Sequence, residues 1–154
     1  MPSPDRIIDV RAATPDDAET AAQLSEALGY PVSAQEMRDR IEWLAASPDH
    51  GVYVACCDSQ VVGWIHVMAV QHMQSEARAE IGGLVVAEGA RSVGIGAQLV
   101  ASAEQWARDA GLAHIVVRSQ IAREAAHRFY LREGYARTKT SAVFSKSLTT
   151  DTHT

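Results

Sequence analysis

Arg91-Ser92-Val93-Gly94-Ile95-Gly96-Ala97 decides the fold of this chain, because two glycines one residue apart follow an apolar, strand-like run and open a long helical pattern. The first N–H groups of a helix have no partner within the helix, and the helix dipole adds partial positive charge at the same end. A glycine-rich turn lets such donors come close to a ligand. The stretch therefore predicts a binding site for an anion, above all a phosphate group.

Three phosphate-binding motifs could explain this stretch, and their spacing separates them. A P-loop ends in Gly-Lys-Ser/Thr, and the stretch contains no lysine. The dinucleotide fingerprint G-x-G-x-x-G needs a third small residue where Leu99 stands, and it should follow an early strand. The pattern that remains is R/Q-x-x-G-x-G/A, which residues 91–96 satisfy.

The segments on both sides of this loop carry further features. Upstream, residues 79–86 form an apolar strand-like run that contains Gly82 and Gly83, and glycines inside a strand often mark a bulge or a close approach of backbone. Downstream, the sequence has the end of a strand, then a helix, then a glycine followed by an aromatic residue. The residues in question are Arg118-Ser119-Gln120, Arg123, Ala126, His127, Phe129-Tyr130 and Gly134-Tyr135.

Together these segments resemble the GCN5-related N-acetyltransferase superfamily over about residues 7–148, most closely over 79–135. The resemblance implies an α/β fold with a mixed, mostly antiparallel central sheet of about seven strands and helices on both faces. In this superfamily the loop cradles the coenzyme A pyrophosphate, and the strand before it splays from its neighbour. The resemblance also implies acetyl-CoA as the co-substrate, with no metal.

On this resemblance, the acetyl-CoA site comprises the splayed strand, the loop and three downstream contacts. Gln120 departs from the family pattern, because Asn is common at its position and Gln is longer by one methylene. The predicted contacts are Leu84, Val85, Val86, Arg91, Ser92, Val93, Gly94, Ile95, Gly96, Ala97, Gln120, His127 and Tyr130.

Acetylation of an amine needs a base, an oxyanion donor and an acid. A lysine-like amine with a pKa of about 10.4 is protonated at neutral pH, so it must lose a proton before it can attack. A backbone N–H of the splayed strand, for which Val85 is the candidate, can stabilise the negative charge on the carbonyl oxygen. Tyr130 matches the family tyrosine near the coenzyme sulfur and is the predicted acid for the departing thiolate.

Glu80 is the predicted base, because histone acetyltransferases of this superfamily carry a glutamate there that acts through water. His66 and His72 are alternatives, since an unperturbed imidazole titrates near neutral pH. No cysteine stands near either motif to carry the acetyl group, which favours direct attack in a ternary complex.

The acceptor is predicted to be a small-molecule primary amine. Residues 28–31 and 71–76 form the loops where specificity can vary on a fixed scaffold, with Tyr30 and Glu76 as candidate substrate contacts. A peptide or protein N-acetyltransferase and a non-catalytic acyl-CoA-binding module remain alternatives.

Length and composition limit the classes of protein that fit. At 154 residues and 47% hydrophobic content, the chain predicts one domain over residues 1–148 and a disordered tail at 149–154. A net charge of −5 and a pI near 5.6 argue against a nucleic-acid partner. The chain shows no signal-peptide pattern and no apolar run of membrane-spanning length, so we expect a cytoplasmic protein without a membrane partner.

Two further expectations concern cysteines and assembly. Cys56 and Cys57 are adjacent in a strand-like run, so they should point to opposite sheet faces and act as small buried hydrophobes. A homodimer through the C-terminal strands is expected by analogy with the superfamily.

Hydrophobic periodicity predicts alternating strands and helices without repeats. The expected helices lie at about 15–28, 34–46, 95–110 and 122–133. The expected strands lie at 7–12, 51–57, 61–70, 79–86, 113–117, 135–139 and 141–146.

Overall fold

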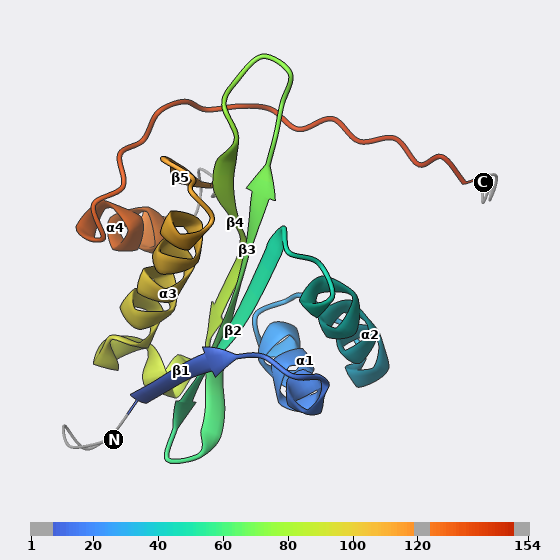
Figure 1. Cartoon of the computed structure of the whole chain (residues 1–154). Helices are drawn as coiled ribbons and strands as arrows, with labels where there is room; N and C mark the ends of the chain where they lie inside the picture. The colour runs from blue at the N-terminus through green and yellow to red at the C-terminus, as the bar shows by residue number, and fades with distance from the viewer. Residues whose placement is uncertain (1–7, 119–123, 150–154) are drawn as a thin grey trace. The chain divides into compact units, whose positions relative to one another are not determined.

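The computed structural model describes residues 8–118 and 124–149, and the chain divides into two compact units, one up to Arg118 and one from Ser119 onward. The first unit is built on a five-stranded sheet in the order β1-β2-β3-β4-β5 (Figure 1). Its strands are β1 (Ile8–Ala12), β2 (His50–Cys57), β3 (Gln60–Val70), β4 (Arg78–Val86) and β5 (Ile115–Val117). Strands β1 to β4 are antiparallel neighbours, and β5 is parallel to β4.

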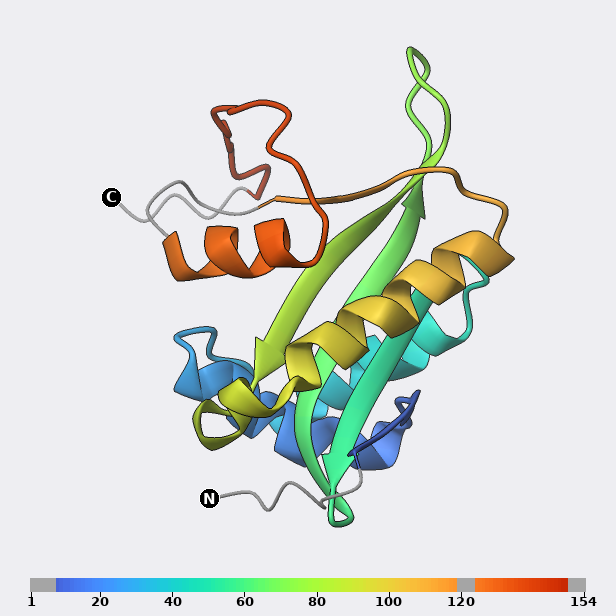
Figure 2. The same ribbon diagram turned by 90° about the vertical axis from the view of Figure 1, so that its left-hand side faces the viewer.

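Helices cover both faces of this sheet. Helices α1 (Ala18–Ala27) and α2 (Ala34–Ala45) lie together on one face, and α3 (Ile95–Asp109) crosses the other, as Figures 1 and 2 show. Two short 3₁₀ segments, η1 (Pro15–Asp17) and η2 (Glu88–Val93), lead into α1 and α3. The prediction of a mixed, mostly antiparallel sheet with helices on both faces is confirmed.

Local sequence explains where these elements begin and end. Ser33 and Glu36 form a reciprocal capping box at the start of α2, in which each side chain accepts a hydrogen bond from the other residue's backbone N–H. The hairpin between β2 and β3 turns at Asp58 and Ser59, whose φ angles of 51° and 69° are those of a tight two-residue turn. That turn sets the start of the pairing between β2 and β3.

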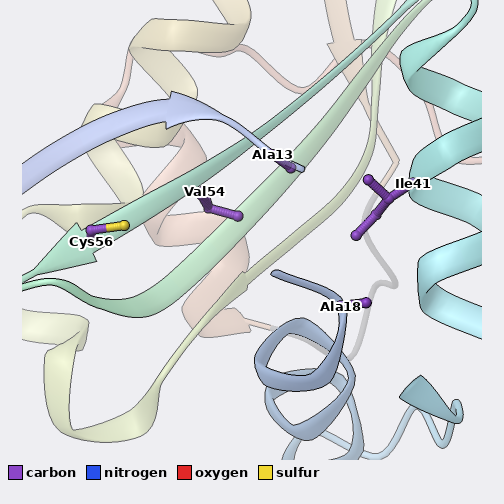
Figure 3. Close-up of a cluster of buried hydrophobic side chains, with 5 residues drawn as sticks. All are labelled: Ala13, Ala18, Ile41, Val54 and Cys56. Atoms are coloured by element: carbon purple, nitrogen blue, oxygen red, sulfur yellow. The ribbon is translucent and has the colours of Figure 1, made fainter. Parts of the chain in front are cut away.

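Two apolar layers hold the helices on the sheet. On the α3 side the largest fully buried side chains include Ile65, Ile95, Leu99 and Val100. On the other side a second cluster joins α1, α2 and β2 (Figure 3); it consists of Ala13, Ala18, Ile41, Val54 and Cys56. The alanines let the helix backbones approach the sheet closely.

The two cysteines behave as expected from their positions. Both are buried and neither forms a disulfide. Cys56 belongs to the cluster under α1 and α2, and strand alternation turns Cys57 to the opposite face. They contribute packing at the end of β2.

The second unit contains α4 (Glu124–Arg132), which ends at Gly134 with a φ of +91°. The prediction of strands at 135–139 and 141–146 is wrong: residues 135–149 form neither strand nor helix. Their β-branched and aromatic residues favour extended backbone, but a strand also needs a neighbouring edge for its hydrogen bonds. Val143 and Phe144 are 88% and 93% exposed, so the described part of the chain has five strands and not about seven. Whether both units form the single expected domain stays a prediction.

Within the described ranges, the helices are too short or too polar to cross a lipid bilayer.

A partly buried ion pair ties β1 to the 3₁₀ turn that leads into α1. Arg11 Nη1 and Nη2 donate to the two carboxylate oxygens of Asp17, each at 2.8 Å, and the Thr14 backbone N–H donates to the same carboxylate at 2.8 Å. Asp17 is only 7% exposed. The hydrogen bonds from Arg11, supported by those from Thr14, hold the pKa of Asp17 below its ordinary value.

We predict that Asp17→Asn lowers the free energy of unfolding by about 2 kcal/mol near pH 7, because charge-assisted hydrogen bonds are lost. A depressed folded-state pKa stabilises the protein above the pKa of the unfolded state, and this contribution disappears as pH falls through the folded-state pKa. Urea denaturation should therefore show a smaller difference between the two proteins near pH 3 than near pH 7. Asp16→Asn, at the exposed neighbouring carboxylate, is the control. Equal differences at both pH values would contradict this account.

Candidate active site

A β-bulge shapes the middle of β4. His66 on β3 lies opposite Gly83, whereas the next residue, Val67, lies opposite Ile81, so Gly82 is the additional residue. A Cβ on Gly82 would lie 2.7 Å from Met68 Cε and 2.9 Å from His66 Nδ1. A Cβ on Gly83 would lie 2.9 Å from the Trp64 ring. The expected bulge is confirmed, and side chains of β3 fill the space beside both glycines.

Strand β4 leaves its neighbour β5 at this bulge. Strand β5 pairs with Ala79, Glu80 and Ile81 only, so within the described residues the β4 edge from Gly82 to Val86 has no strand partner on that side. Ala87 donates its N–H to Val62 on β3, and alternation then turns the Val85 backbone groups toward β3 and those of Leu84 and Val86 toward the open edge. The geometry thus favours Leu84 and Val86 over Val85 as donors to a ligand.

The N-terminus of α3 offers backbone donors as well. Gly94 occupies the N-cap position with a φ of +83°, makes no side-chain cap, and is followed by no acidic residue in the first turn. The first N–H that bonds within the helix is that of Gln98, which donates to the Gly94 carbonyl. The N–H groups of Ile95, Gly96 and Ala97 precede it, and a helix gives such groups no internal partner. The side chains of Arg91, Ser92 and Val93 lie outside the described part of the structure.

Charged side chains gather on the sheet face that carries α1 and α2. Glu80 lies next to Val116 of β5, and its carboxylate lies 3.4 Å from Arg118 Nε and 4.0 Å from Arg78 Nη2. The Glu80 side chain is 19% exposed. Arg78 Nε is buried and has no hydrogen-bond partner among the described residues. This face therefore presents a carboxylate beside two guanidinium groups, and Arg78 Nε has a hydrogen bond still to donate.

Two histidines contact each other on the same face. His50 Nδ1 lies 2.9 Å from His66 Nε2, and the rings are stacked with centroids 5.1 Å apart. Burial, and secondarily the neighbouring His50, lowers the pKa of His66. Sequence reasoning considered His66 and missed His50. His50 lies one residue before the expected strand at 51–57, and its contact with His66 depends on the register of β2 and β3, which shifts between Ala55 and Cys56.

The other predicted site residues lie on two loops of the first unit and on α4 of the second. Tyr30 follows α1 and is 52% exposed, and Glu76 lies exposed in the loop between β3 and β4, which also contains His72. His127 and Tyr130 belong to α4 in the second unit, where the Tyr130 ring contacts Phe129 and Tyr135. Gln120 lies outside the described residues. Among residues 8–118 and 124–149, no three His, Cys, Asp or Glu side chains gather to hold a metal ion.

Known proteins share both this sequence pattern and this fold. The model of the Acetyltransferase (GNAT) family matches residues 18–135, most of the chain. The chain belongs to the GNAT family of acetyltransferases. It is therefore an N-acetyltransferase that uses acetyl-CoA as co-substrate, and the donor groups on β4 and α3 match the anionic and amide-rich character of that molecule.

Individual GNAT relatives are similar over nearly the whole chain. An aminoalkylphosphonate N-acetyltransferase of Salmonella typhimurium is 35% identical over 131 residues, covering 84% of this chain and 85% of the relative. An aminoglycoside N(6')-acetyltransferase of Stenotrophomonas maltophilia is 28% identical over 90% of this chain and 93% of its own. The solved structure of the aminoglycoside N-acetyltransferase AAC(6')-Iy in complex with CoA has a TM-score of 0.82 at 16% identity, covering 95% of this chain and 98% of the other. At that identity, the structural likeness speaks for the fold alone.

We predict that Gly94→Glu weakens acetyl-CoA binding on the order of 100-fold, because it strains the left-handed backbone and adds a negative charge at the helix N-terminus. Calorimetric titration of the folded proteins measures the change. Gly111→Glu is the matched control, since Gly111 also has a positive φ, lies in open space and sits just beyond the other end of α3. Equal affinities for both variants would contradict an anion site at Gly94.

Proposed function

We propose that this GNAT enzyme acetylates a small primary amine that also carries an anionic group, of which an aminoalkylphosphonate is the model. The observation that carries the proposal is the Arg78–Glu80–Arg118 cluster on β4 and the end of β5, beside the strand edge that β5 leaves open. The 35% identity to an aminoalkylphosphonate N-acetyltransferase supports the same acceptor class.

The donor would be held mainly by backbone. The N–H and C=O groups of Leu84 and Val86 face the open edge of β4, where an extended amide-bearing arm can pair as a strand would. The loop at 91–97 and the N–H groups at the start of α3 would hold the pyrophosphate. Acetyl-CoA supplies an electrophilic thioester carbonyl and a thiolate leaving group. A strand N–H from Leu84 or Val86 is positioned to stabilise charge on a carbonyl oxygen at this edge.

The acceptor would be held by charge. Glu80 attracts the ammonium group, and Arg78 and Arg118 bind the anionic group, since guanidinium forks match phosphonate and carboxylate oxygens. The unpartnered Arg78 Nε supports this role, because a buried donor is stabilised when it gains an acceptor. Tyr30 and Glu76, on two loops, are proposed to contact the remainder of the acceptor.

Direct attack of the amine on the donor fits the positions of the cysteines. The chain has two cysteines, and both are buried at the end of β2 beside the hairpin turn. Neither lies on β4 or at the α3 N-terminus, so an acetyl-cysteine intermediate has no thiol there. Tyr130 is proposed as the acid that protonates the thiolate, with His127 and Gln120 as further donor contacts.

An aminoglycoside acceptor is the second candidate, because aminoglycoside acetyltransferases recur among the relatives. Such acceptors are polycations, and the two guanidinium groups beside Glu80 would repel them.

We also propose that the protein forms a homodimer and is located in the cytoplasm. The exposed Val143, Phe144 and Leu148 support a homodimer, whose mass sedimentation would measure.

We predict that Tyr130→Phe lowers kcat roughly 100-fold, because a general acid contributes about that factor, and leaves the acetyl-CoA Kd within about threefold. The rate of release of the coenzyme A thiol gives kcat, and calorimetric titration gives the acetyl-CoA Kd. Replacing the neighbouring Phe129 with Tyr is the control for packing within α4. An unchanged kcat in Tyr130→Phe would remove the tyrosine from the mechanism.

We predict that the wild-type enzyme acetylates 2-aminoethylphosphonate and that Arg78→Met raises the acceptor KM at least about tenfold, through loss of charge-assisted hydrogen bonds. The same variant should not impair acetylation of n-propylamine, whose propyl group carries no charge. Arg108→Met, at an exposed residue of α3, is the control. If the enzyme acetylates the aminoglycoside sisomicin rapidly and does not acetylate aminoalkylphosphonates, an aminoglycoside is the favoured acceptor.

A further inference from the structure

The contact between His50 and His66 has no role in donor or acceptor binding as described so far. Their nitrogens lie 2.9 Å apart, and imidazole rings at that distance share one proton. His50 also lies near Trp43, with ring centroids 5.7 Å apart, and Trp43 is 69% exposed. The pair therefore extends from the interior of β3 toward solvent.

The inner end of this pair faces the β4 bulge. His66 uses Nε2 to contact His50, and its other nitrogen, Nδ1, lies 2.9 Å from the point where a Gly82 Cβ would stand. The missing side chains at Gly82 and Gly83 leave this nitrogen beside the strand section that separates from β5. Glu80 lies two residues before Gly82, opposite Met68 on the same face. An amine attracted by Glu80 would meet His66 Nδ1 at the bulge.

We propose that His66 is the general base that deprotonates the acceptor ammonium and that His50 relays the proton to solvent. This rests on the proposed function, since it assumes an amine acceptor on this sheet face.

The two rings allow a balanced proton transfer. In the competent tautomer, His66 carries its proton on Nε2 and donates it to His50 Nδ1, which leaves a lone pair on His66 Nδ1. The ammonium loses one proton to that lone pair, His66 passes its Nε2 proton to His50, and His50 releases its own Nε2 proton to water. The amine becomes neutral and nucleophilic, and no other reactant is needed. Both tautomers of the pair can form, because the rings are neutral donors and acceptors.

Glu80 is less suited to the same step. Its carboxylate already forms ion pairs with Arg118 and Arg78. Its task in this scheme is to attract and orient the ammonium. Within the described residues, the buried side chains of α1 and α2 are uncharged, namely Ala18, Ala21, Ala22, Ser25 and Ile41, and α2 brings Trp43 to His50. The charged and titratable groups on this sheet face beside His66 are thus His50, Glu80, Arg78 and Arg118.

The electrostatics of His66 agree with this role. Burial lowers its pKa below the ordinary histidine value, so the ring is mostly neutral at pH 7 and can accept a proton. Because the neutral form is active, kcat/KM should rise with pH through the pKa of His66 and then level off. The midpoint of that rise should lie below about 6.5.

The test compares His66→Gln and His50→Asn with the wild-type enzyme, using 2-aminoethylphosphonate and, should it be inert, a panel of primary amines. The Asn side-chain amide lies near the position of His50 Nδ1, so it can still accept the hydrogen bond from His66. Asn has no second ring nitrogen, so it cannot pass a proton to solvent. His114→Asn, at an exposed residue before β5, is the control. Thermal unfolding and acetyl-CoA calorimetry establish that each variant folds and binds the donor.

We expect His66→Gln to lower kcat on the order of 100-fold and to abolish the acidic limb of the pH profile. His50→Asn should retain that limb, lose part of kcat and show a smaller solvent deuterium isotope effect, because one fewer proton moves. Glu80→Gln should raise the acceptor KM more than it lowers kcat. An unchanged pH profile in His66→Gln, or an unchanged isotope effect in His50→Asn, would overturn the relay. Failure of the wild-type enzyme to acetylate every amine tested would instead overturn the proposed function.

Discussion

The separation of β4 from β5 is the constraint on which the rest of this structure depends. A strand in a sheet normally satisfies backbone hydrogen bonds on both sides, and β4 has strand partners on both sides only from Ala79 to Ile81 within the described residues. The bulge at Gly82 bends the strand where the pairing stops; Met68 and His66 already fill the space that a side chain at Gly82 would need, and Trp64 fills the space at Gly83. Backbone groups of Leu84 and Val86 are thereby left for a ligand.

The same constraint organises the two ends of the site. Beyond the open edge, the chain turns through η2 and reaches the N-terminus of α3, where Gly94 exposes further N–H groups and buried Ile95 and Leu99 fix the helix to the sheet. On the opposite sheet face, the bulge leaves room for the His50–His66 pair beside Glu80. In the proposed function, donor recognition rests on backbone, whereas acceptor recognition and proton transfer are assigned to side chains.

Sequence reasoning succeeded where a local pattern is sufficient. The glycines at 82 and 83 predicted a bulge in the strand before the loop, and the glycine-rich turn at 94–96 predicted the start of a helix; the structure has both. Sequence reasoning failed where an element depends on a segment distant in the sequence. The expected strands at 135–139 and 141–146 followed from the family resemblance, but a strand also needs an adjacent edge, which the segment cannot supply by itself. His50 was missed for a related reason: its contact with His66 depends on the register of β2 and β3, which shifts at Cys56.

Amide hydrogen exchange with bound donor tests the central claim most directly. If backbone of β4 and of the α3 N-terminus holds acetyl-CoA, the donor should slow exchange in residues 82–86 and in residues 94–97. S-acetyl-pantetheine, which lacks the pyrophosphate, should protect residues 82–86 alone. Protection confined to β1 and β2, or equal protection of residues 94–97 by both compounds, would contradict the account.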